Sequence, residues 1–596
     1  MLTERVYYLL KNKDAKLDRF LVLTFTKAAA SEMKTRIRSR VLKDETLVDL
    51  SSDIENSHIE TFDAFCLFLA KKYANQLGIA RDISPIEGAL LKIKRKNIIQ
   101  EILNEYYEKE DDIFSQFMMS FCTKDDNLIY EVIEKIYSLY SRSFDRKDFR
   151  KNFVNRTMSE ENYRKQTNDY MSEIKALADE IAKDDKWYSM ENTVYAEKAV
   201  DYYKQIASLN SYQEFYDFMQ VNKLPNRRLK DFKLGPDDKK FADEINDKFF
   251  SRYVGGQEKK ELVVNPDNAI KEIKKTEGYV KTLFDIFNKM LDKLEAFSRE
   301  YNCYSHDEIA LMCINLLIEN ENIRKEVANS FDYIMVDEYQ DTNDIQEKML
   351  NLIGNKNIFM VGDVKQSIYR FRNADCSIFQ KKYDTYKNND DINGTKIDLN
   401  TNYRSRNEIV DDINNIFEQL FIPKFNPIDY STGHAFKFGN TKDYGEGDNL
   451  NQNQKLEVYC YDFNRGNSGH KTGDINKEIN LIADDIIEKI NNKFTVIDHD
   501  DHNNPVSRPV NFKDFAIIID RGSSFDKFKK ELSNRNIPVQ VIKNEDISGK
   551  DVSSVAKSLL TLYSNVGKEE PNEIELKHSF VSIARSFLFE YSDEKI

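Results

Sequence analysis

The chain has 596 residues, enough for about four domains of ordinary size. Its 88 basic and 102 acidic residues give a net charge of −14, which argues against a large surface that coats nucleic acid but leaves room for a narrow basic channel. No apolar run approaches the roughly 18 residues of a membrane span, and no signal peptide is present, so we expect a cytoplasmic protein without membrane contact. The six cysteines lack metal-ligand spacing, and we expect them to be reduced thiols.

The N-terminal part of the chain is predicted to consist of strand and helix units. Residues 20–25 form a short apolar, β-branched run that is typical of a buried strand. The alanine-rich segment after Lys27 favours a tightly packed helix. On these residues alone, the segment is an ordinary strand–helix unit.

The next 200 residues are charge-dense and contain few glycines and prolines. Patterns such as IYEVIEKIYSLY (129–140) indicate amphipathic helices. Two basic patches, KIKRK (92–96) and NRRLKDFK (226–233), are candidate DNA contacts, although solvated helix faces are the simpler interpretation of both.

The strand–helix pattern then resumes, with a predicted helix over 306–330 and an apolar run over 331–336. Only Asp332 is charged in that run, as expected for a parallel strand buried on both faces. It stops at Asp337 and Glu338, at the strand end where open α/β sheets bind ligands. There Asp337 can hold Mg²⁺ through its water shell, and Glu338 can orient and deprotonate the water that attacks a γ-phosphate. Taken alone, the pair is more simply a strand end with two solvated acids.

A further predicted strand at 358–361 runs into GDVKQSIYRFRNAD (362–375). Gly362 permits a tight turn, and Gln366 carries an uncharged amide that can touch both a γ-phosphate and the attacking water. Rings and cations then alternate over a short stretch, a chemistry suited to single-stranded nucleic acid: Tyr369, Arg370, Phe371 and Arg372. Taken alone, this stretch is more simply explained by core rings beside solvated charges.

The last 200 residues repeat the alternation of strands and helices. We expect a strand before Arg404, a polar loop at 439–454 and a largely helical end from about 546. The segment DHDDH (498–502) is interpreted as a solvated loop rather than a metal site. Further elements are predicted in this order: a strand at LEVYCY (456–461), a helix over 475–490 and a strand at FAIIID (515–520).

VDEYQDTN (336–343) followed by VGDVKQSIYRFRNAD (361–375) resembles motifs II and III of superfamily 1 DNA helicases of the UvrD type. Lys365 and Phe371 resemble the AddA/RecB branch more than the UvrD/Rep branch, which tends to carry acidic and Trp residues there. Within that branch, the chain is most similar to the AddA family of ATP-dependent helicase/nuclease subunits in Firmicutes.

Two stretches near the N-terminus extend this resemblance. FLVLTFTKAAASEMKTRI (20–37) resembles motif Ia, and IETFDAFCLFLAKKYA (59–74) resembles the motif that follows it. The family usually has His and Ser where this chain has Asp63 and Ala64, so a DNA contact at those two positions is in doubt. The resemblance implies DNA contacts from Thr24, Phe25, Thr26, Thr61, Tyr369, Phe371 and Arg372.

LNTNYRS (399–405) resembles motif IV, in which the Tyr stacks on or near adenine and the Arg reaches the γ-phosphate. Here these residues are Tyr403 and Arg404. The resemblance therefore implies ATP and Mg²⁺ as cofactors, with Asp337 as the metal ligand. The implied catalytic residues are Glu338, Asp337, Gln366 and Arg404, and the implied nucleotide-binding residues are Asp337, Gln366, Tyr403 and Arg404.

An ATPase of this kind needs a phosphate-binding loop, GxxxxGK[ST], and none of the 19 glycines belongs to one. The opening residues MLTERV (1–6) resemble the helix that directly follows that loop. Nothing matches motifs V and VI, the nuclease domain or its four-cysteine iron–sulfur site. We therefore expect an internal portion of a longer helicase, from an engineered truncation, a split gene or an incomplete sequence, with little or no ATPase activity of its own.

The resemblance implies an α/β fold with two RecA-like P-loop NTPase motor domains and large helical insertions. The expected parts are 1–88 and 301–392 for the first motor domain, 89–300 for its helical insertion, 393–545 for part of the second motor domain, and 546–596 for the start of a second insertion.

The implied function is that of the motor portion of a 3′ to 5′ DNA helicase in double-strand break processing and recombinational repair. Its partners would be single- and double-stranded DNA and a second helicase/nuclease subunit of the AddB type. Two alternatives stay open. One is a UvrD/Rep-type repair helicase without a nuclease, which the long helical insertion and Lys365 disfavour. The other is a non-enzymatic DNA-binding or assembly module. The absence of a phosphate-binding loop from this sequence keeps that alternative open.

Overall fold

The computed structural model contains two compact units, Met1–Lys396 and Ile397–Ile596, and each is described by itself. The described residues are 1–596 without the following: 14, 123–124, 225–232, 256–262, 387–393, 422–429, 431–432, 445–454, 460–474, 501–503, 542–550, 566–572, 593–594 and 596. Within them, no helix is both long enough and apolar enough to cross a membrane.

Unit 1 contains a four-stranded parallel sheet with the strand order β2-β1-β5-β6. All five residues of β1 are buried, as expected for an apolar strand inside a parallel sheet. The three strands predicted in this unit, at 20–25, 331–336 and 358–361, are confirmed. Each observed strand is one or two residues shorter than the predicted one. The strands are β1 (Phe20–Thr24), β2 (His58–Thr61), β5 (Tyr333–Val336) and β6 (Ile358–Met360).

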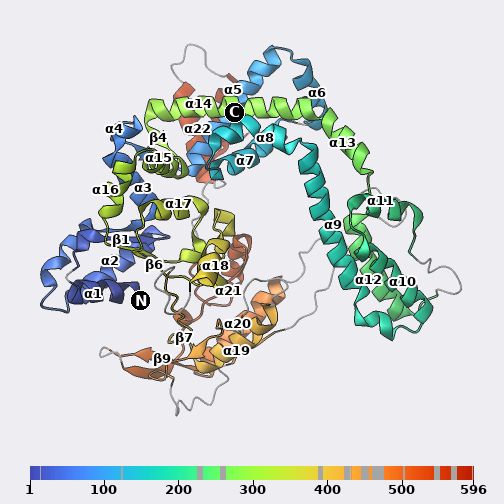
Figure 1. Cartoon of the computed structure of the whole chain (residues 1–596). Coiled ribbons are helices and arrows are strands. Elements are labelled where there is room, and N and C mark those ends of the chain that lie inside the picture. The colour runs from blue at the N-terminus through green and yellow to red at the C-terminus, as the bar shows by residue number, and fades with distance from the viewer. Residues whose placement is uncertain are drawn as a thin grey trace. The chain divides into compact units, whose positions relative to one another are not determined.

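Helices cover both faces of this sheet (Figure 1). Successive side chains of a strand point to opposite faces. Accordingly, Phe20 and Val22 pack with α1 and α2 in one core, whereas Leu21 and Leu23 pack with α3, α15, α16 and α17 in another. The helix bounds are α1 (Leu2–Asn12), α2 (Lys27–Val41), α3 (Phe62–Lys72), α4 (Ala74–Leu77), α15 (His306–Glu319), α16 (Glu321–Asn329), α17 (Asp344–Ile353) and α18 (Cys376–Thr385).

The single helix predicted over 306–330 is two helices, α15 and α16. The break occurs at Asn320, whose backbone leaves the helical conformation at φ −121° and ψ 95°. The Asn320 side chain accepts a hydrogen bond from the Ile323 backbone N–H at 3.1 Å and so starts α16. The apolar periodicity continues across Asn320, so the pattern of apolar residues alone does not reveal the break that this capping residue introduces.

Between β3 (Ser84–Pro85) and β4 (Cys303–Tyr304) the described residues form helices joined by turns and loops, with no strand among them. Those two short strands pair in parallel, so the segment leaves and rejoins the rest of unit 1 at one place. The pattern at 129–140 forms part of α7, as predicted. The helices are α5 (Gly88–Glu108), α6 (Asp112–Phe121), α7 (Asn127–Arg142), α8 (Arg146–Thr157), α9 (Glu160–Ala182), α10 (Thr193–Ser208), α11 (Tyr212–Val221), α12 (Pro236–Tyr253), α13 (Pro266–Lys275) and α14 (Glu277–Tyr301).

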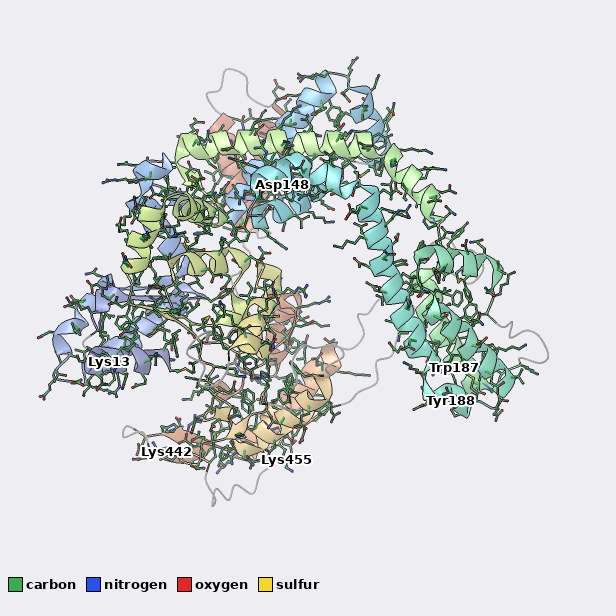
Figure 2. The ribbon with its side chains drawn as sticks, in the orientation of Figure 1. Lys13, Asp148, Trp187, Tyr188, Lys442 and Lys455 are labelled. Carbon is green, nitrogen blue, oxygen red and sulfur yellow. The ribbon has the colours of Figure 1, made fainter. Side chains whose placement is uncertain are left out.

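Two separate hydrophobic cores hold this helical segment together. One joins α5, α6, α7, α8 and α14, and Figure 1 shows α5 and α14 lying side by side. The other joins α9, α10, α11 and α12 around Trp187, which is 1% exposed and is marked in Figure 2 beside the exposed Tyr188. The Trp187 indole N–H donates to the Ile181 carbonyl oxygen at 2.7 Å, so its polar atom is satisfied inside the core.

The basic patch KIKRK belongs to the packing of the first of these cores. Arg95 is 6% exposed, forms an ion pair with Glu134 at 2.7 Å and lies 4.0 Å from the centre of the Tyr137 ring. Lys94 and Lys96 also lie over aromatic rings. These contacts favour the simpler interpretation, a helix surface. Most of the other patch, 226–233, lies outside the described residues.

Unit 2 contains two small sheets and several helices. β7 (Thr401–Asn402) pairs in parallel with β8 (Lys437–Phe438), and β9 (Thr495–His499) pairs antiparallel with β10 (Pro505–Pro509). The helix predicted over 475–490 is confirmed as α20, and helices also form near the C-terminal end, as predicted. The helices are α19 (Asn407–Leu420), α20 (Ile475–Asn491), α21 (Phe525–Asn534), α22 (Asp551–Asn565) and α23 (Glu573–Arg585).

Two sequence predictions in unit 2 are wrong, and a third holds only in part. No strand forms at 515–520 or in the described part of LEVYCY, 456–459. An apolar run becomes a strand only where a neighbouring strand supplies hydrogen-bond partners for its backbone. Here the side chains are instead open to solvent, with Val458 76% and Ile518 94% exposed. Conversely, DHDDH is not simply a loop: its first two residues end β9, where Asp498 accepts a hydrogen bond from Arg508 of β10 at 2.6 Å.

Candidate functional site

Asp337 and Glu338 lie directly after β5, at the carboxyl edge of the sheet. The Asp337 backbone N–H still donates to the Leu23 carbonyl oxygen at 2.9 Å, so sheet pairing extends as far as the first acid. Glu338 then takes the left-handed conformation, with φ 49° and ψ 45°. That conformation is strained for a residue other than glycine, and such strain concentrates at functional sites.

The electrostatic surroundings of Asp337 favour its neutral form. Burial raises the pKa of this carboxyl, and the negative charge of Glu338 raises it further. The Glu338 backbone N–H, the Met1 amine and Arg36 oppose this by lowering the pKa. A cation bound at this edge would therefore relieve an unfavourable concentration of negative charge.

Gln340 joins the two motifs through its side-chain amide. Its Nε2 donates to Glu338 Oε2 at 2.7 Å, and its Oε1 accepts from the Asp363 backbone N–H at 3.0 Å. Gln340 is 1% exposed, so the amide has no freedom to turn away. The Cβ of an alanine at Gly362 would lie 2.6 Å from that Oε1, which explains the glycine in the loop after β6.

Asp341 is a buried acid close to the exposed Glu338. It is 4% exposed, and its Oδ1 has no hydrogen-bond partner among the described residues. Burial raises the pKa of Asp341 to about 6, with a further contribution from the charge of Glu338. The sequence pointed to the QDTN stretch as a whole, but the prediction gave no role to Gln340 or Asp341.

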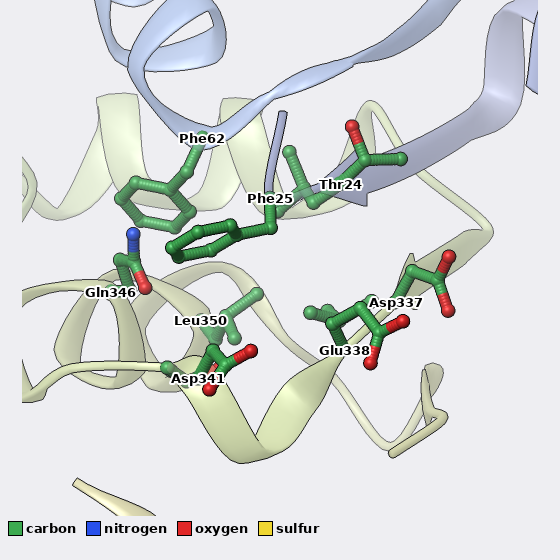
Figure 3. Close-up of a pocket in the computed structure, with 11 residues that line it drawn as sticks. Thr24, Phe25, Phe62, Asp337, Glu338, Asp341, Gln346 and Leu350 are labelled. Carbon is green, nitrogen blue, oxygen red and sulfur yellow. The ribbon is translucent and has the colours of Figure 1, made fainter. Parts of the chain in front are cut away.

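A pocket lies between the ends of β1 and β5 and the helices α3 and α17 (Figure 3). Figure 3 shows the carboxylates of Glu338 and Asp341 on one side and the rings of Phe25 and Phe62 on the other. The pocket therefore adjoins residues from motifs Ia and II. Its lining residues are Leu23, Thr24, Phe25, Phe62, Val336, Asp337, Glu338, Asp341, Thr342, Gln346 and Leu350.

The loop after β6 holds the predicted Gln366 at its surface. Gln366 Nε2 donates to Asp363 Oδ2 at 3.0 Å, and Lys365 Nζ lies 2.9 Å from Asp363 Oδ1. Because Asp363 also donates its backbone N–H to Gln340, a continuous chain of hydrogen bonds links Glu338 to Gln366.

Three aromatic rings from two motifs lie in a row. The centres of the Phe25 and Tyr369 rings are 4.9 Å apart, and those of Tyr369 and Phe371 are 5.9 Å apart. Phe371 is 75% exposed, so the alternative that it is a core residue is contradicted. We call Phe25, Tyr369 and Phe371 the aromatic row. Arg372 ends the same turn, but its side chain lies outside the described residues.

The three predicted threonines shape the turns beside this row. Thr24 is 4% exposed, and its hydroxyl donates to the Thr26 carbonyl oxygen at 3.1 Å. The Thr26 hydroxyl accepts from the Ala29 backbone N–H and caps α2. The Thr61 hydroxyl accepts from the Ala64 backbone N–H and caps α3. All three hydroxyls therefore take part in folding the strand-to-helix turns.

Tyr403 and Arg404 belong to unit 2, whereas the carboxylates and the aromatic row belong to unit 1. Asn402 Oδ1 accepts from the backbone N–H groups of Arg404 and Ser405, at 2.8 Å and 2.9 Å. Tyr403 is 70% exposed. The turn thus presents both predicted side chains on the surface of unit 2.

Within the described part of the chain, no three His, Cys, Asp or Glu side chains are arranged to hold a metal ion. The profile of the UvrD/REP helicase N-terminal domain matches residues 1–387. The chain belongs to this helicase family. The predicted resemblance to UvrD-like helicases is thereby confirmed, and the RecA-like character of the motor in this family agrees with the parallel sheet of unit 1.

Curated relatives of this UvrD-family chain are named ATP-dependent helicase/nuclease subunits of the A type. The protein from Clostridium botulinum (strain Alaska E43) is 27% identical over 90% of this chain and 47% of its own length. The Clostridium beijerinckii protein is 25% identical over 100% of this chain and 51% of its own length. The Bacillus velezensis protein is 28% identical over 88% of this chain and 45% of its own length. The chain spans about half the length of these relatives, and the predicted similarity to AddA is confirmed.

Proposed function

We propose that this chain is the motor portion of an ATP-dependent 3′ to 5′ DNA helicase of the AddA type. In the cell it would act with a second subunit of the AddB type on single- and double-stranded DNA during double-strand break repair. One observation carries the proposal: hydrogen bonds run from Glu338 through Gln340 and Asp363 into the loop that contributes two rings, Tyr369 and Phe371, to the aromatic row. A motor must connect the site of ATP hydrolysis to the residues that bind DNA. In this proposal the hydrogen bonds from Glu338 to Gln366, which all lie within unit 1, make that connection.

The proposal assigns 1–88 and 301–392 to one RecA-like motor domain and 89–300 to its helical insertion. Residues 393–545 would belong to the second motor domain, and 546–596 to a second insertion. Two observations support this division: the parallel sheet of unit 1, and the absence of strands among the described residues between β3 and β4.

The acidic edge of the sheet fits Mg²⁺ and ATP. Oxygen donors are the ligands that Mg²⁺ prefers, and the burial of Asp337 next to Glu338 creates a demand for positive charge. When bound, Mg²⁺–ATP supplies the γ-phosphate that is transferred to water. Asp337 would hold the metal, Glu338 would orient and deprotonate the water, and Gln340 fixes the Glu338 carboxylate at 2.7 Å. From unit 2, Tyr403 would stack on adenine and Arg404 would reach the γ-phosphate.

The aromatic row fits single-stranded DNA. Each base offers a π-face that can stack on a ring, whatever the sequence of the strand. Phe371 is exposed enough to do so, while Phe25 and Tyr369 support it in the row. Gln366 and Arg372 lie in the same loop, where DNA contact and nucleotide state can influence one another.

The Glu338→Gln variant tests the nucleotide part of the proposal. It should be made in a chain extended at its N-terminus with the phosphate loop of a relative. We expect ATP hydrolysis to be lost and ATP binding to stay within about twofold, because the amide keeps the shape and removes the base. Equal loss of binding and hydrolysis would show that Glu338 is structural. Asp344→Asn, an exposed acid on α17, is a matched control that should keep both activities.

The unextended chain distinguishes the helicase proposal from a DNA-binding module. We expect it to bind single-stranded DNA and to hydrolyse little or no ATP, since its sequence lacks the loop lysine that neutralises phosphate charge. Robust DNA-stimulated hydrolysis by residues 1–596 would contradict this expectation. If the extended chain binds DNA but also fails to hydrolyse ATP, the non-enzymatic alternative gains the stronger support.

A further inference from the structure

The short parallel pair β7–β8 in unit 2 brings Gly439 against the side chains of Thr401 and Tyr403. The Gly439 backbone N–H donates to the Asn402 carbonyl oxygen at 2.9 Å, just beyond the last residue of β8. Thr401 lies in β7, and Tyr403 directly follows the strand. A Cβ added to Gly439 would meet both side chains, so both lie against this glycine.

A side chain at position 439 would force the side chains of Thr401 and Tyr403 to move. A Cβ added to Gly439 would lie 2.9 Å from Tyr403 Cε1 and 3.2 Å from Tyr403 Cδ1, and closer still to Thr401 Cγ2. The Tyr403 ring therefore rests directly on the Gly439 backbone. It is nevertheless 70% exposed, so it also presents a wide surface to solvent.

The same segment fixes the neighbouring arginine. Asn402 Oδ1 holds the backbone N–H groups of Arg404 and Ser405, while the Asn402 carbonyl oxygen holds Gly439. One residue thus ties together the Arg404 turn and the support of the Tyr403 ring. A displacement of the ring would leave the backbone position of Arg404 in place.

We propose that Gly439 is a positioning residue that sets the orientation of the Tyr403 ring and, through it, the stacking of that ring on the nucleotide base. This inference rests on the proposed function, in which Tyr403 stacks on the nucleotide. Gly439 itself touches no ligand. Its lack of a side chain leaves room for the ring beside the backbone, and the ring stays largely exposed there.

Gly439→Ala in a Thr401→Ser background tests this inference. Thr401→Ser removes the Cγ2 atom that an alanine would meet first, so the remaining close contact of the new Cβ is the Tyr403 ring. Thr401→Ser alone is the reference. Gly88→Ala, at a glycine whose added Cβ would meet nothing within 4 Å, is the control for a glycine-to-alanine change. Melting temperatures of the variants establish that each one is folded.

Two measurements on the full chain follow the ring and the nucleotide. A 3-fluorotyrosine at position 403 reports ring orientation by ¹⁹F NMR without any ligand, and its signal should shift in Gly439→Ala/Thr401→Ser. Affinities for ATP, GTP and inorganic tripolyphosphate separate base from phosphate binding. We expect the affinities for ATP and GTP to fall together, each about tenfold, which is the scale of one aromatic–base stack. Affinity for tripolyphosphate should not change.

The Tyr403→Ala variant distinguishes failure of this inference from failure of the proposed function. If Tyr403→Ala weakens ATP binding but Gly439→Ala/Thr401→Ser does not, Gly439 has no positioning role and the inference is wrong. An unmoved ¹⁹F signal leads to the same conclusion. If Tyr403→Ala also leaves ATP binding unchanged, Tyr403 does not stack on the base, and the proposed role of Tyr403 fails together with the inference.

Discussion

The replacement of Asp341 by Asn tests the electrostatic description of the pocket. Asp341 is 4% exposed, and burial raises its pKa from the ordinary 3.8 to about 6. A pKa difference of about 2.2 corresponds to about 3 kcal/mol against the ionised folded state. The amide has the same shape without the charge, and the cost of burying its own polar atoms offsets part of the gain. We therefore expect Asp341→Asn to stabilise the protein at pH 7 by about 1 to 3 kcal/mol.

The pH dependence follows from the same difference. The folded state binds the proton of Asp341 more tightly than the unfolded chain does, so this residue makes the protein more stable as the pH falls from about 6 to about 4. The stability is lost as the pH rises through that window. Asp341→Asn should remove this dependence. Glu338→Gln should reduce it, because the charge of Glu338 is the second cause of the raised pKa.

Hydrogen exchange measured by mass spectrometry on peptides covering β5 and α17 gives the local stability in this region. The rates are corrected for the intrinsic pH dependence of exchange, and EDTA keeps divalent cations away from the site. Asp344→Asn, exposed on α17, is the control and should leave the pH dependence unchanged. Reduced stability of Asp341→Asn at pH 7, or an unchanged dependence between pH 4 and 7, would refute the reasoning.

Three further substitutions test other parts of the structure. Phe371→Ala should weaken single-stranded DNA binding by about 1 to 3 kcal/mol. The melting temperature should change little, because the ring is 75% exposed. A large fall in stability with unchanged affinity would show that Phe371 does not contact DNA. Arg95→Met should lower the free energy of unfolding in urea by about 3 to 5 kcal/mol, because Glu134 loses its partner. The double variant Arg95→Met/Glu134→Leu should recover most of that loss. Equal losses in the single and double variants would contradict this explanation. Gly362→Ala should cost about 1 to 3 kcal/mol and slow ATP hydrolysis in the extended chain, since its Cβ would displace Gln340, whereas full activity would show that the bridge is dispensable.

The parallel strands of unit 1 were predictable because burial on both faces leaves a continuous apolar run. Phe20–Thr24 and Tyr333–Val336 are such runs, and the acids that follow the second one mark its end. In unit 2 the same rule failed at 515–520, where an apolar run has no neighbouring strand among the described residues. Pairing depends on residues distant in the sequence, so a local pattern alone could not decide it.

The candidate site was predictable in its residue types but not in its connections. The motif pattern singled out Glu338, Gln366 and Phe371. It could not reveal that Gln340 is the amide that joins them, because that role depends on a backbone N–H 23 positions away. Nor could it separate Thr24, whose side chain is buried, from the exposed Phe371.

The helical lobe of α9, α10, α11 and α12 has a practical consequence for measurement. Its core shares no buried residue with the cores described on the two faces of the sheet. Trp187, the single tryptophan of the chain, lies at the centre of this lobe. Intrinsic tryptophan fluorescence therefore follows the unfolding of the lobe and not that of the motor. A variant could lose the structure around Asp337 and Glu338 entirely and still give an unaltered fluorescence melting curve.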